Sequence, residues 1–563
     1  MPVFDEEKQN KKINELHLDE AEGLAQVLAQ RYGLPYVDLT KVPINTDALL
    51  LVSEAESREA GLACFKASGK NIDVAILTPN NPKVQEVKNE LAGKNFLPDL
   101  YMVSQNSLES AWERYSEVSS SKHSDAGIIS ISDDQVKTLM ADIKHMQDVD
   151  HLVQKESAIA LQVGGISAIL EIILAGSLAL KASDIHIEPQ ETDVRLRYRL
   201  DGVLQDITSI HPHIYHQILS RIKLVSGLKL NVKKNSQDGR FSIKVGEFEI
   251  EIRTSVIPSN YGESIVMRVL DPRSLQVSFE NLGVEPHLFS IFEREISKPN
   301  GLVLLTGPTG SGKTTTLYSF LSKISTPENK VITIEDPVEY HLKGINQTQV
   351  SRESNYTFLS GLRAALRQDP DVIMVGEIRD GETAKIAINS ALTGHLVFSS
   401  LHTNNAAGAI PRLIDLGISS KIITSALTLS IAQRLIRKLC VDCRKEDTPT
   451  ADEQKIIDGV VETVKKKRPD FVIPDSHKCW RATGCDKCNN TGYKGRVGIF
   501  EAIYMDDAIA KTTIENPSEK ELKISAIPQG VLDMRQDGIL KVLGAITSLD
   551  EVGRVVDLYE EFI

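Results

Sequence analysis

The sequence predicts an α/β protein of several domains, whose largest part is a mostly parallel β-sheet covered by helices. The chain has 563 residues, and at roughly 100–200 residues per domain this length predicts about three to five domains. Its hydrophobic fraction of 41% and charged fraction of 25% are those of a folded globular protein. Between residues 286 and 435, apolar runs such as LVLLTG, VITIEDP and LVFSSLH alternate with helical segments, which is the pattern of a parallel sheet between helices.

The parts of the chain can be placed in order from composition and periodicity. The N-terminal part combines a helical stretch (21–32), a strand (73–77) and a Pro-Asn-Asn-Pro turn. The polar segment YSEVSSSKHSDAG is typical of a linker, and after it a long helix precedes alternating strands such as VRLRYRL. We therefore expect an α/β module (1–118), a linker (119–132), a second α+β N-terminal domain (133–285), the sheet-and-helix core (286–435), a four-cysteine subdomain (436–500) and a C-terminal helical region (501–563).

Charge and apolar patterning limit the partners and the compartment. The 64 basic and 77 acidic residues leave a formal charge of −13, which argues against a nucleic-acid partner, although a local basic surface is compatible with it. The longest apolar stretch, Ile166–Leu180, contains Glu171 and is shorter than the roughly 20 residues of a membrane span, so we expect a buried helix. The N-terminus lacks the apolar segment of a secretory signal, and six cysteines are few, so we expect a cytosolic protein.

A complete P-loop pattern, GPTGSGKT, lies between the apolar run LVLLT and the helix-prone TTTLYSFLSKI. Its glycines let backbone N–H groups surround phosphates, and the following helix N-terminus adds positive potential. Lys313 is expected to reach the β- and γ-phosphates of ATP, and the Thr314 hydroxyl to bind Mg²⁺. The predicted nucleotide-binding residues here are Gly307, Pro308, Thr309, Gly310, Ser311, Gly312, Lys313, Thr314 and Thr315.

Two carboxylates follow predicted strands of the same sheet. Glu377 ends the run DVIMVGE, and Glu335 ends the run VITIE. Because the carboxyl ends of parallel strands share one edge of a sheet, both side chains are expected near the phosphates. We predict that Glu377 polarises the attacking water and that Glu335 is a second catalytic carboxylate; how the two divide their roles is left open.

Two histidines flank the strand run LVFSS. His402 follows it, at the edge where a nucleotide would lie, and is predicted to sense the γ-phosphate. His395 precedes it and is included among the candidate nucleotide-binding residues.

Two CxxC pairs, Cys440 with Cys443 and Cys485 with Cys488, are separated by 41 residues. Four thiolates in two such pairs are typical of a closed, tetrahedral Zn²⁺ site. The alternative is thiol redox chemistry, which needs only one pair. Cys479 has no partner at this spacing and Cys64 is expected in a core, so neither is a predicted ligand.

Several segments together resemble the secretion ATPase family that powers type II secretion and type IV pilus assembly (the GspE/PilB type). The resemblance covers about residue 155 to the end with specific motifs, and the first 118 residues resemble the N-terminal module of these ATPases more loosely. The P-loop is similar to the family's Walker A loop. The matching segments downstream are an Asp box (Thr333–Tyr340), an arginine-rich stretch with an atypical Walker B motif (Arg363–Asp380) and a His box (Gly394–Asn404); those upstream are Ser183–Pro189, Arg195–Gly202 and Gln237–Arg240.

The resemblance implies a RecA-like motor core in a homohexameric ring, with ATP between the second N-terminal domain and the core. Arg240 and Arg253 match family positions that approach the γ-phosphate, and Arg363, Arg367 and Arg379 match positions near the nucleotide or a subunit interface. The implied cofactors are ATP, Mg²⁺ and Zn²⁺. The implied partners are further copies of the chain, an inner-membrane platform protein and the pilus or secretion machinery, so that the protein lies peripherally at the cytoplasmic face of the inner membrane.

Three alternatives accompany the preferred function, which is ATP hydrolysis that drives type IV pilus assembly. The first is the type II secretion ATPase of the same family, because the motor motifs of the two nearly coincide. The second is a RecA-like nucleic-acid translocase, which would need basic or aromatic pore loops, whereas the chain is acidic with 5% aromatic residues. The third is a nucleotide-gated binding module without turnover.

Overall fold

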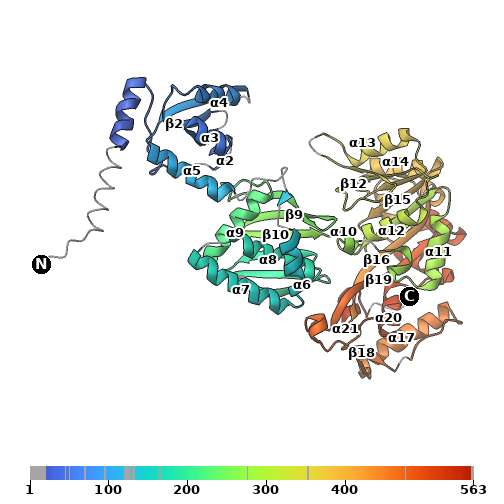
Figure 1. The fold of residues 1–563 in the computed structure, drawn as a ribbon. Coiled ribbons are helices and arrows are strands. Elements are labelled where there is room, and N and C mark those ends of the chain that lie inside the picture. The colour runs from blue at the N-terminus through green and yellow to red at the C-terminus, as the bar shows by residue number, and fades with distance from the viewer. Residues whose placement is uncertain are drawn as a thin grey trace. The chain divides into compact units, whose positions relative to one another are not determined.

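The structure is a computed structural model, and it describes residues 21–42, 44, 46–49, 51–68, 71–93, 97–119, 128–129, 133–163, 166–275, 277–351, 354–475 and 477–559. The chain forms two compact units, residues 1–126 and 127–563 (Figure 1). Most of the predicted linker (119–132) lies outside the described residues. Within it, β4 (Ile128–Ile129) pairs with Ser242 and Ile243, so these two residues extend a sheet of the second unit.

The first unit is a small α/β module. Its sheet has the order β1-β2-β3, in which β2 is antiparallel to β1 and parallel to β3. The predicted helix at residues 21–32 and a strand over most of 73–77 are present, and Cys64 is fully buried. The elements after the first helix are α2 (Thr46–Leu49), α3 (Glu54–Ala60), β1 (Leu62–Ser68), β2 (Asn71–Ile76), α4 (Pro82–Gly93), β3 (Leu97–Met102) and α5 (Gln105–Ser119).

A mostly antiparallel sheet dominates the first half of the second unit. Its order is β4-β8-β9-β10-β5-β6-β7, and its apolar face shares a core with four helices, α6 to α9. The apolar stretch from Ile166 forms one of these helices, α8, as expected from its length. The elements are α6 (Asp133–Asp142), α7 (Met146–Val163), α8 (Ile166–Ala179), β5 (Asp184–Pro189), β6 (Val194–Leu200), β7 (Val203–Ile210), α9 (Pro212–Val225), β8 (Gln237–Val245), β9 (Phe248–Ser259) and β10 (Gly262–Leu270).

A second seven-stranded sheet, called the motor sheet below after its expected role and forming the motor core with its helices, has the order β13-β12-β14-β15-β11-β16-β19. All its neighbours are parallel except β16 and β19. The strands are β11 (Gly301–Thr306), β12 (Val331–Glu335), β13 (Asn346–Gln349), β14 (Val372–Val375), β15 (Leu396–Leu401), β16 (Leu427–Leu439) and β19 (Tyr493–Tyr504). The helices up to β16 are α10 (Pro272–Leu275), η1 (Phe279–Leu282), α11 (Pro286–Ile296), α12 (Lys313–Ile324), α13 (Phe358–Ala365), η2 (Leu366–Gln368), α14 (Gly381–Leu392), α15 (Ala409–Asp415) and α16 (Ser420–Ala426).

Helices cover both faces of the motor sheet (Figure 1). Successive strand side chains point to opposite faces, so the fully buried strand β11 contributes to two cores. Leu302 and Leu304 pack with side chains of α13 and α14, whereas Val303 and Leu305 pack with α11 and α12. This arrangement, with β15 between β11 and β14, confirms the predicted α/β fold with a RecA-like P-loop core.

The C-terminal segments join the motor sheet rather than forming separate layers. β16 continues through Leu439, beyond the expected boundary at 435, and β19 crosses the expected boundary at 500. The two strands pair from Leu429 with Tyr504 to Leu439 with Tyr493, so the cysteine segment is an insertion between paired strands. The remaining elements are β17 (Lys445–Asp447), α17 (Ala451–Lys467), β18 (Cys479–Arg481), η3 (Asp486–Cys488), α18 (Asp507–Glu515), α19 (Glu519–Ala526), η4 (Ile527–Gln529), α20 (Met534–Leu543) and α21 (Leu549–Gly553). No described helix combines the length and the apolarity needed to cross a membrane.

A buried carboxylate attaches the C-terminal helix α21 to β16. The Glu551 side chain is fully buried and accepts hydrogen bonds from the Arg437 guanidinium at 2.6 and 2.9 Å and from Arg554 at 2.7 Å. Burial acts to raise the pKa of Glu551, but the hydrogen bonds from Arg554 and Arg437 outweigh it and the pKa is lowered.

Replacing Glu551 by alanine is expected to cost about 3 kcal/mol of unfolding free energy, because the largely buried Arg437 would lose its fully buried partner, whereas the exposed Arg554 would lose only a weaker pair. A urea titration at neutral pH measures this loss. The matched control is Glu462→Ala, which removes an exposed pair with Lys466 and is expected to leave the unfolding free energy almost unchanged. Because the folded pKa of Glu551 is lowered, its contribution should disappear as pH falls below about 4.3, the ordinary value for Glu. Equal losses of stability in the two variants would contradict the role of the buried carboxylate.

Candidate nucleotide-hydrolysis site

The P-loop connects β11 to α12, as its position in the sequence predicts. Gly307, Gly310 and Gly312 adopt positive φ values of 144°, 80° and 90°, which side chains rarely tolerate. The helix begins at Lys313, directly after the left-handed Gly312, so its free N–H groups face the loop. This backbone is suited to surround phosphate oxygens.

Gly307 is also required sterically. A Cβ atom on Gly307 would lie 2.7 Å from the carbonyl oxygen of Gln433 and 2.6 Å from Ser311 Oγ. We expect Gly307→Ala to weaken ATP binding by at least about tenfold, since the strand and the loop must separate and the left-handed backbone adds about 1–2 kcal/mol of strain. Gly310→Ala is the matched control, because φ there is 80° but nothing lies within 4 Å of an added Cβ. Fluorescent-nucleotide titration measures the ATP affinity of both variants. Equal losses of affinity would show that backbone strain, and not the contact with Gln433, causes the effect.

The loop side chains fit a bound nucleotide and Mg²⁺. Lys313 Nζ donates to the carbonyl oxygens of Gly307 and Pro308 at 2.8 and 3.1 Å, and burial lowers the pKa of Lys313. Thr314 is exposed on the first turn of α12, with a hydroxyl that can bind a cation. Ser311 Oγ is buried and has no hydrogen-bond partner among the described residues. A lysine that bonds only backbone carbonyls and an unpartnered hydroxyl are both consistent with a phosphate-binding loop.

Gln433 is a supporting residue that the sequence did not reveal. Its side-chain oxygen accepts from Thr316 Oγ1 at 2.8 Å, and its backbone carbonyl lies against Gly307. Gln433 belongs to β16, which runs beside β11 although 126 residues separate Gly307 from it. Only knowledge of the strand order would have placed it here.

Glu377 and His402 meet at the carboxyl edge of the sheet. Glu377 follows β14 and His402 follows the neighbouring β15, and their Oε2 and Nε2 atoms lie 3.0 Å apart. Arg379 also donates to Glu377, and to Asp336 at 3.4 Å. Burial acts to raise the pKa of Glu377, but hydrogen bonds from His402 and Arg379 outweigh it and lower the pKa. Glu377 is therefore an ionised carboxylate held beside the P-loop.

Glu335 lies deeper than Glu377. Its carboxylate is 3% exposed and accepts hydrogen bonds from Thr333 Oγ1 at 2.5 Å, Gln347 Nε2 at 3.2 Å and the Tyr318 hydroxyl. Burial raises the pKa of Glu335, with the hydrogen bonds acting in the opposite sense. Because its oxygens are occupied, its geometry suits a residue that orients the end of β12 better than one that contacts water.

His395 does not lie with the other candidates. β15 is parallel to β11, with Leu396 beside Gly301 and Leu401 beside Thr306. His395 therefore precedes the amino end of β15, about 20 Å from the P-loop edge at the usual rise per residue. Its Nδ1 atom lies 3.0 Å from the Ser390 carbonyl oxygen. The prediction that His395 binds the nucleotide of its own chain is therefore wrong. His395 lies between α14 and β15, at the edge of the sheet opposite the P-loop.

The other predicted arginines differ in their contacts and exposure. Arg253 donates to Glu339 Oε2 at 2.9 Å and to the Val338 carbonyl at 3.1 Å, which connects β9 to the Asp-box segment. Arg240 lies directly opposite Arg253 on β8 and is exposed. Two like charges at paired positions are unfavourable unless an anion lies between them.

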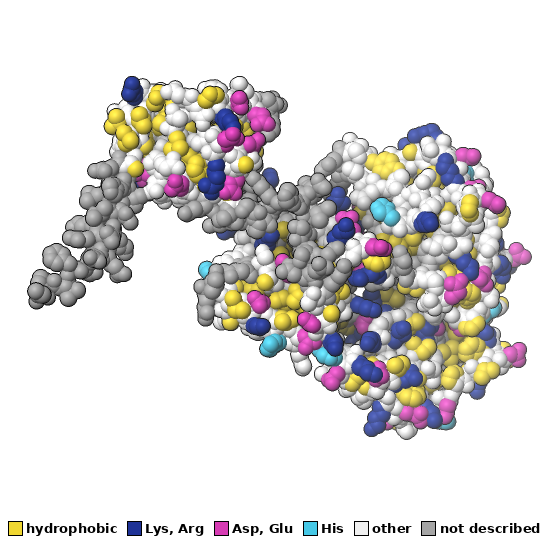
Figure 2. All heavy atoms as spheres, viewed as in Figure 1, with side chains coloured by type: hydrophobic (Ala, Val, Ile, Leu, Met, Phe, Trp, Pro, Cys, Tyr) yellow, Lys and Arg dark blue, Asp and Glu magenta, His cyan; other side chains and the backbone are white. Residues whose placement is uncertain are grey.

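Figure 2 shows basic side chains gathered in the middle of the 127–563 unit, so this acidic chain has a local basic surface. Arg363 and Arg367 are exposed on α13 and η2.

The four predicted cysteine ligands converge. All four sulfur atoms lie within 4.8 Å of one another, with separations of 3.9 Å (Cys440–Cys485), 3.8 Å (Cys443–Cys488) and 3.7 Å (Cys485–Cys488). Tetrahedral Zn²⁺ with bonds of about 2.3 Å requires sulfur separations of about 3.8 Å. Cys479 lies outside this cluster, where its Sγ lies 3.5 Å from the Asp447 carbonyl. The cluster therefore has the dimensions of a structural zinc site.

Known proteins resemble this chain along most of its length. The family described as type II/IV secretion system protein matches residues 161–554, and the MshEN domain matches residues 32–122. The type IV pilus assembly ATPase PilB of Myxococcus xanthus is 36% identical over 530 residues, which cover 94% of this chain and 90% of that protein. The type II secretion system protein E of Aeromonas hydrophila is 42% identical over 427 residues, covering 75% and 82%. Among solved structures, the Legionella pneumophila ATPase DotB matches with a TM-score of 0.49 at 22% identity, covering 69% of this chain and 94% of that one.

Proposed function

Because this chain belongs to the type II/IV secretion system protein family, we propose that it is the ATPase that drives type IV pilus assembly. It is a P-loop ATPase, and the contact between Glu377 and His402 beside the P-loop is the observation that best supports turnover. The pilus assignment is supported by coverage: the PilB relative matches 94% of the chain, including the N-terminal module, whereas the type II relative matches 75%.

In the proposed reaction, Glu377 accepts a proton from a water molecule whose oxygen attacks the γ-phosphorus of ATP. The bond from that phosphorus to the bridging oxygen breaks, and ADP and phosphate leave. The hydrogen bond between His402 and Glu377 supports a role for His402 in orienting the carboxylate, and His402 is proposed to sense the γ-phosphate. Mg²⁺ bound through Thr314 would neutralise phosphate charge, and Lys313 would exchange its loop carbonyls for phosphate oxygens.

Arg253 and Arg240 are proposed to couple hydrolysis to motion. Arg253 donates a hydrogen bond to Glu339. A phosphate that competed with this carboxylate for Arg253 would break the contact between β9 and the Asp-box segment. We also propose that the chain forms a homohexamer and that it acts on an inner-membrane platform protein at the cytoplasmic face. The cysteine cluster is proposed to bind Zn²⁺. Arg363 and Arg367, exposed on α13 and η2, are available to a neighbouring subunit.

The function is tested in the source organism by replacing the chromosomal copy with Lys313→Ala. We expect surface pili to disappear while protein secretion continues. Loss of secretion with normal pili would favour the type II alternative. For the nucleic-acid translocase, ATP hydrolysis is measured with and without single-stranded DNA; strong stimulation by DNA would contradict the secretion-motor assignment.

A further inference from the structure

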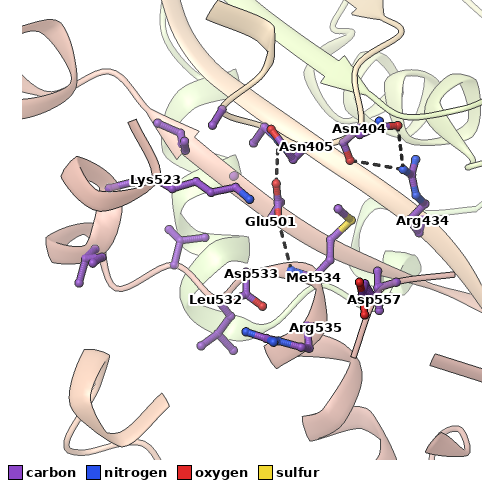
Figure 3. Close-up of a pocket in the computed structure, with 18 of the residues that line it drawn as sticks. Asn404, Asn405, Arg434, Glu501, Lys523, Leu532, Asp533, Met534, Arg535 and Asp557 are labelled. Atoms are coloured by element: carbon purple, nitrogen blue, oxygen red, sulfur yellow. Dashed lines mark hydrogen bonds between the residues drawn. The ribbon is translucent and has the colours of Figure 1, made fainter. Parts of the chain in front are cut away.

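A cavity of about 500 Å³ lies between the carboxyl edge of the motor sheet and the C-terminal helices (Figure 3). Its walls come from the loop after His402 (404–407), from β16 and β19, from α19 and α20, and from residues 555–557. None of the P-loop residues 307–315 lines it, although Arg434 lies near enough to Lys313 to contribute to lowering the pKa of that lysine. The cavity therefore adjoins the nucleotide site without sharing its loop. Its volume is within the range of about 300–1,000 Å³ in which proteins bind small molecules.

The cavity carries an excess of positive charge in an acidic chain. Four basic side chains line it, Arg434, Lys467, Lys523 and Arg535, against three acidic ones, Glu501, Asp533 and Asp557. Burial raises the pKa of Glu501, which increases the excess. The cavity therefore favours an anion over a neutral or cationic ligand.

Arg434 is the least compensated of these cations. It is half-buried, and its guanidinium donates only to the Asn404 carbonyl and side-chain oxygens, at 3.4 and 3.5 Å. Among the described residues, no carboxylate forms a salt bridge with it; Glu501 attracts it from a greater distance, but burial outweighs this attraction and lowers the pKa of Arg434. A half-buried guanidinium held only by long bonds to neutral oxygens would gain from a phosphate or carboxylate.

Glu501 connects the cavity to the candidate active site. Its two carboxylate oxygens accept the backbone N–H groups of Ala406, at 2.7 Å, and Met534, at 3.4 Å, and Lys523 points toward it (Figure 3). Ala406 lies four residues after His402 on one loop. A ligand between Arg434 and α20 would thus press on the loop that carries His402. Apart from Asn404 and Asn405, the rest of the wall is apolar, with side chains such as Ile503, Leu532 and Val555.

We propose that this cavity binds a small organic anion, one phosphate or carboxylate group on an apolar body, and that binding fixes the loop 403–408. The anionic group lies between Arg434 and Arg535, and the apolar body lies against Ile503 and Leu532. This site is independent of the proposed role in pilus assembly.

The test uses calorimetric titration of the full chain with saturating Mg-ADP, which keeps the probes out of the P-loop. Four probes separate the contributions: 1-naphthyl phosphate, 1-naphthoate, the neutral 1-naphthalenemethanol and inorganic phosphate. We expect one of the two naphthyl anions to bind at least tenfold more tightly than both the neutral alcohol and inorganic phosphate, and to identify the preferred anionic group.

Variants locate the site. Arg535→Gln is expected to weaken the better anion at least fivefold, and Ala526→Trp, which fills the cavity from the end of α19, to abolish binding. Arg496→Gln is the matched control: it removes an exposed arginine of β19 outside the cavity and should change nothing. Hydrogen exchange on the unaltered chain gives a readout that needs no variant, with slower exchange expected in 403–408 and 531–535. No binding by any probe, binding unaffected by Ala526→Trp in a folded chain, or unchanged exchange in both segments would overturn the proposal.

Discussion

Replacing Glu377 by glutamine is expected to reduce kcat for ATP hydrolysis by about 10²–10⁴-fold, while ATP affinity stays within about threefold of the unaltered chain. Glutamine keeps the size of the side chain and can still contact His402, but it has no carboxylate to accept a proton. The nucleotide is held by the P-loop, which this substitution leaves intact, so binding and turnover should separate.

The measurement pairs a phosphate-release assay with a fluorescent-nucleotide titration. Glu382→Gln is the matched control, because Glu382 is an exposed carboxylate in the first turn of α14, five residues further along. It should retain turnover. Glu335→Gln distinguishes the two carboxylates: since Glu335 is buried among hydrogen-bond donors, we expect mainly lower stability and a smaller loss of kcat. If Glu335→Gln abolished turnover and Glu377→Gln did not, the assignment of the base would be reversed.

Removing zinc from the cysteine cluster is expected to have the second large effect. Structural zinc contributes about 10–16 kcal/mol of apparent binding energy in small peptides, so even a fraction of it exceeds an ordinary single substitution. The cluster connects residues after β16 with residues before β19, at the end of the paired strands. We therefore expect Cys485→Ser to lose the metal and to expose residues 440–492 to proteolysis before the rest of the motor core unfolds.

Elemental analysis of the purified chain should find one zinc per chain, lost on Cys485→Ser. Cys479→Ala is the control, because Cys479 is buried outside the cluster and should keep the metal. Zinc content that does not differ between the two variants, or no zinc in the unaltered chain under reducing conditions, would contradict a four-thiolate site.

Local patterns predicted those parts of the site that single segments form. The P-loop needs only a strand, a glycine-rich turn and a helix in succession, and all three occur where the motif predicts. Likewise, CxxC spacing requires two turns, and these converge because β16 and β19 pair. The position of Glu377 beside His402 followed from the rule that parallel strands end at one edge of a sheet.

Features that depend on strand order or on distant packing were not predictable from one sequence. Gln433 supports Gly307 only because β16 is the neighbour of β11, and nothing local indicates that order. His395 and His402 flank one strand, and because this strand of six residues is parallel to β11, the two histidines lie at opposite edges of the sheet. The cavity beside Arg434 forms from six separate segments that lie between residues 404 and 557.

Steady-state ATP hydrolysis by the full-length chain, with Mg²⁺ and without nucleic acid, tests the central claim most directly. We expect turnover that requires Mg²⁺, disappears with Lys313→Ala, and is unaffected by single-stranded DNA. A chain that binds ATP tightly but does not release phosphate, alone or with membranes that contain its machinery, would contradict the claim that this site is a hydrolytic motor.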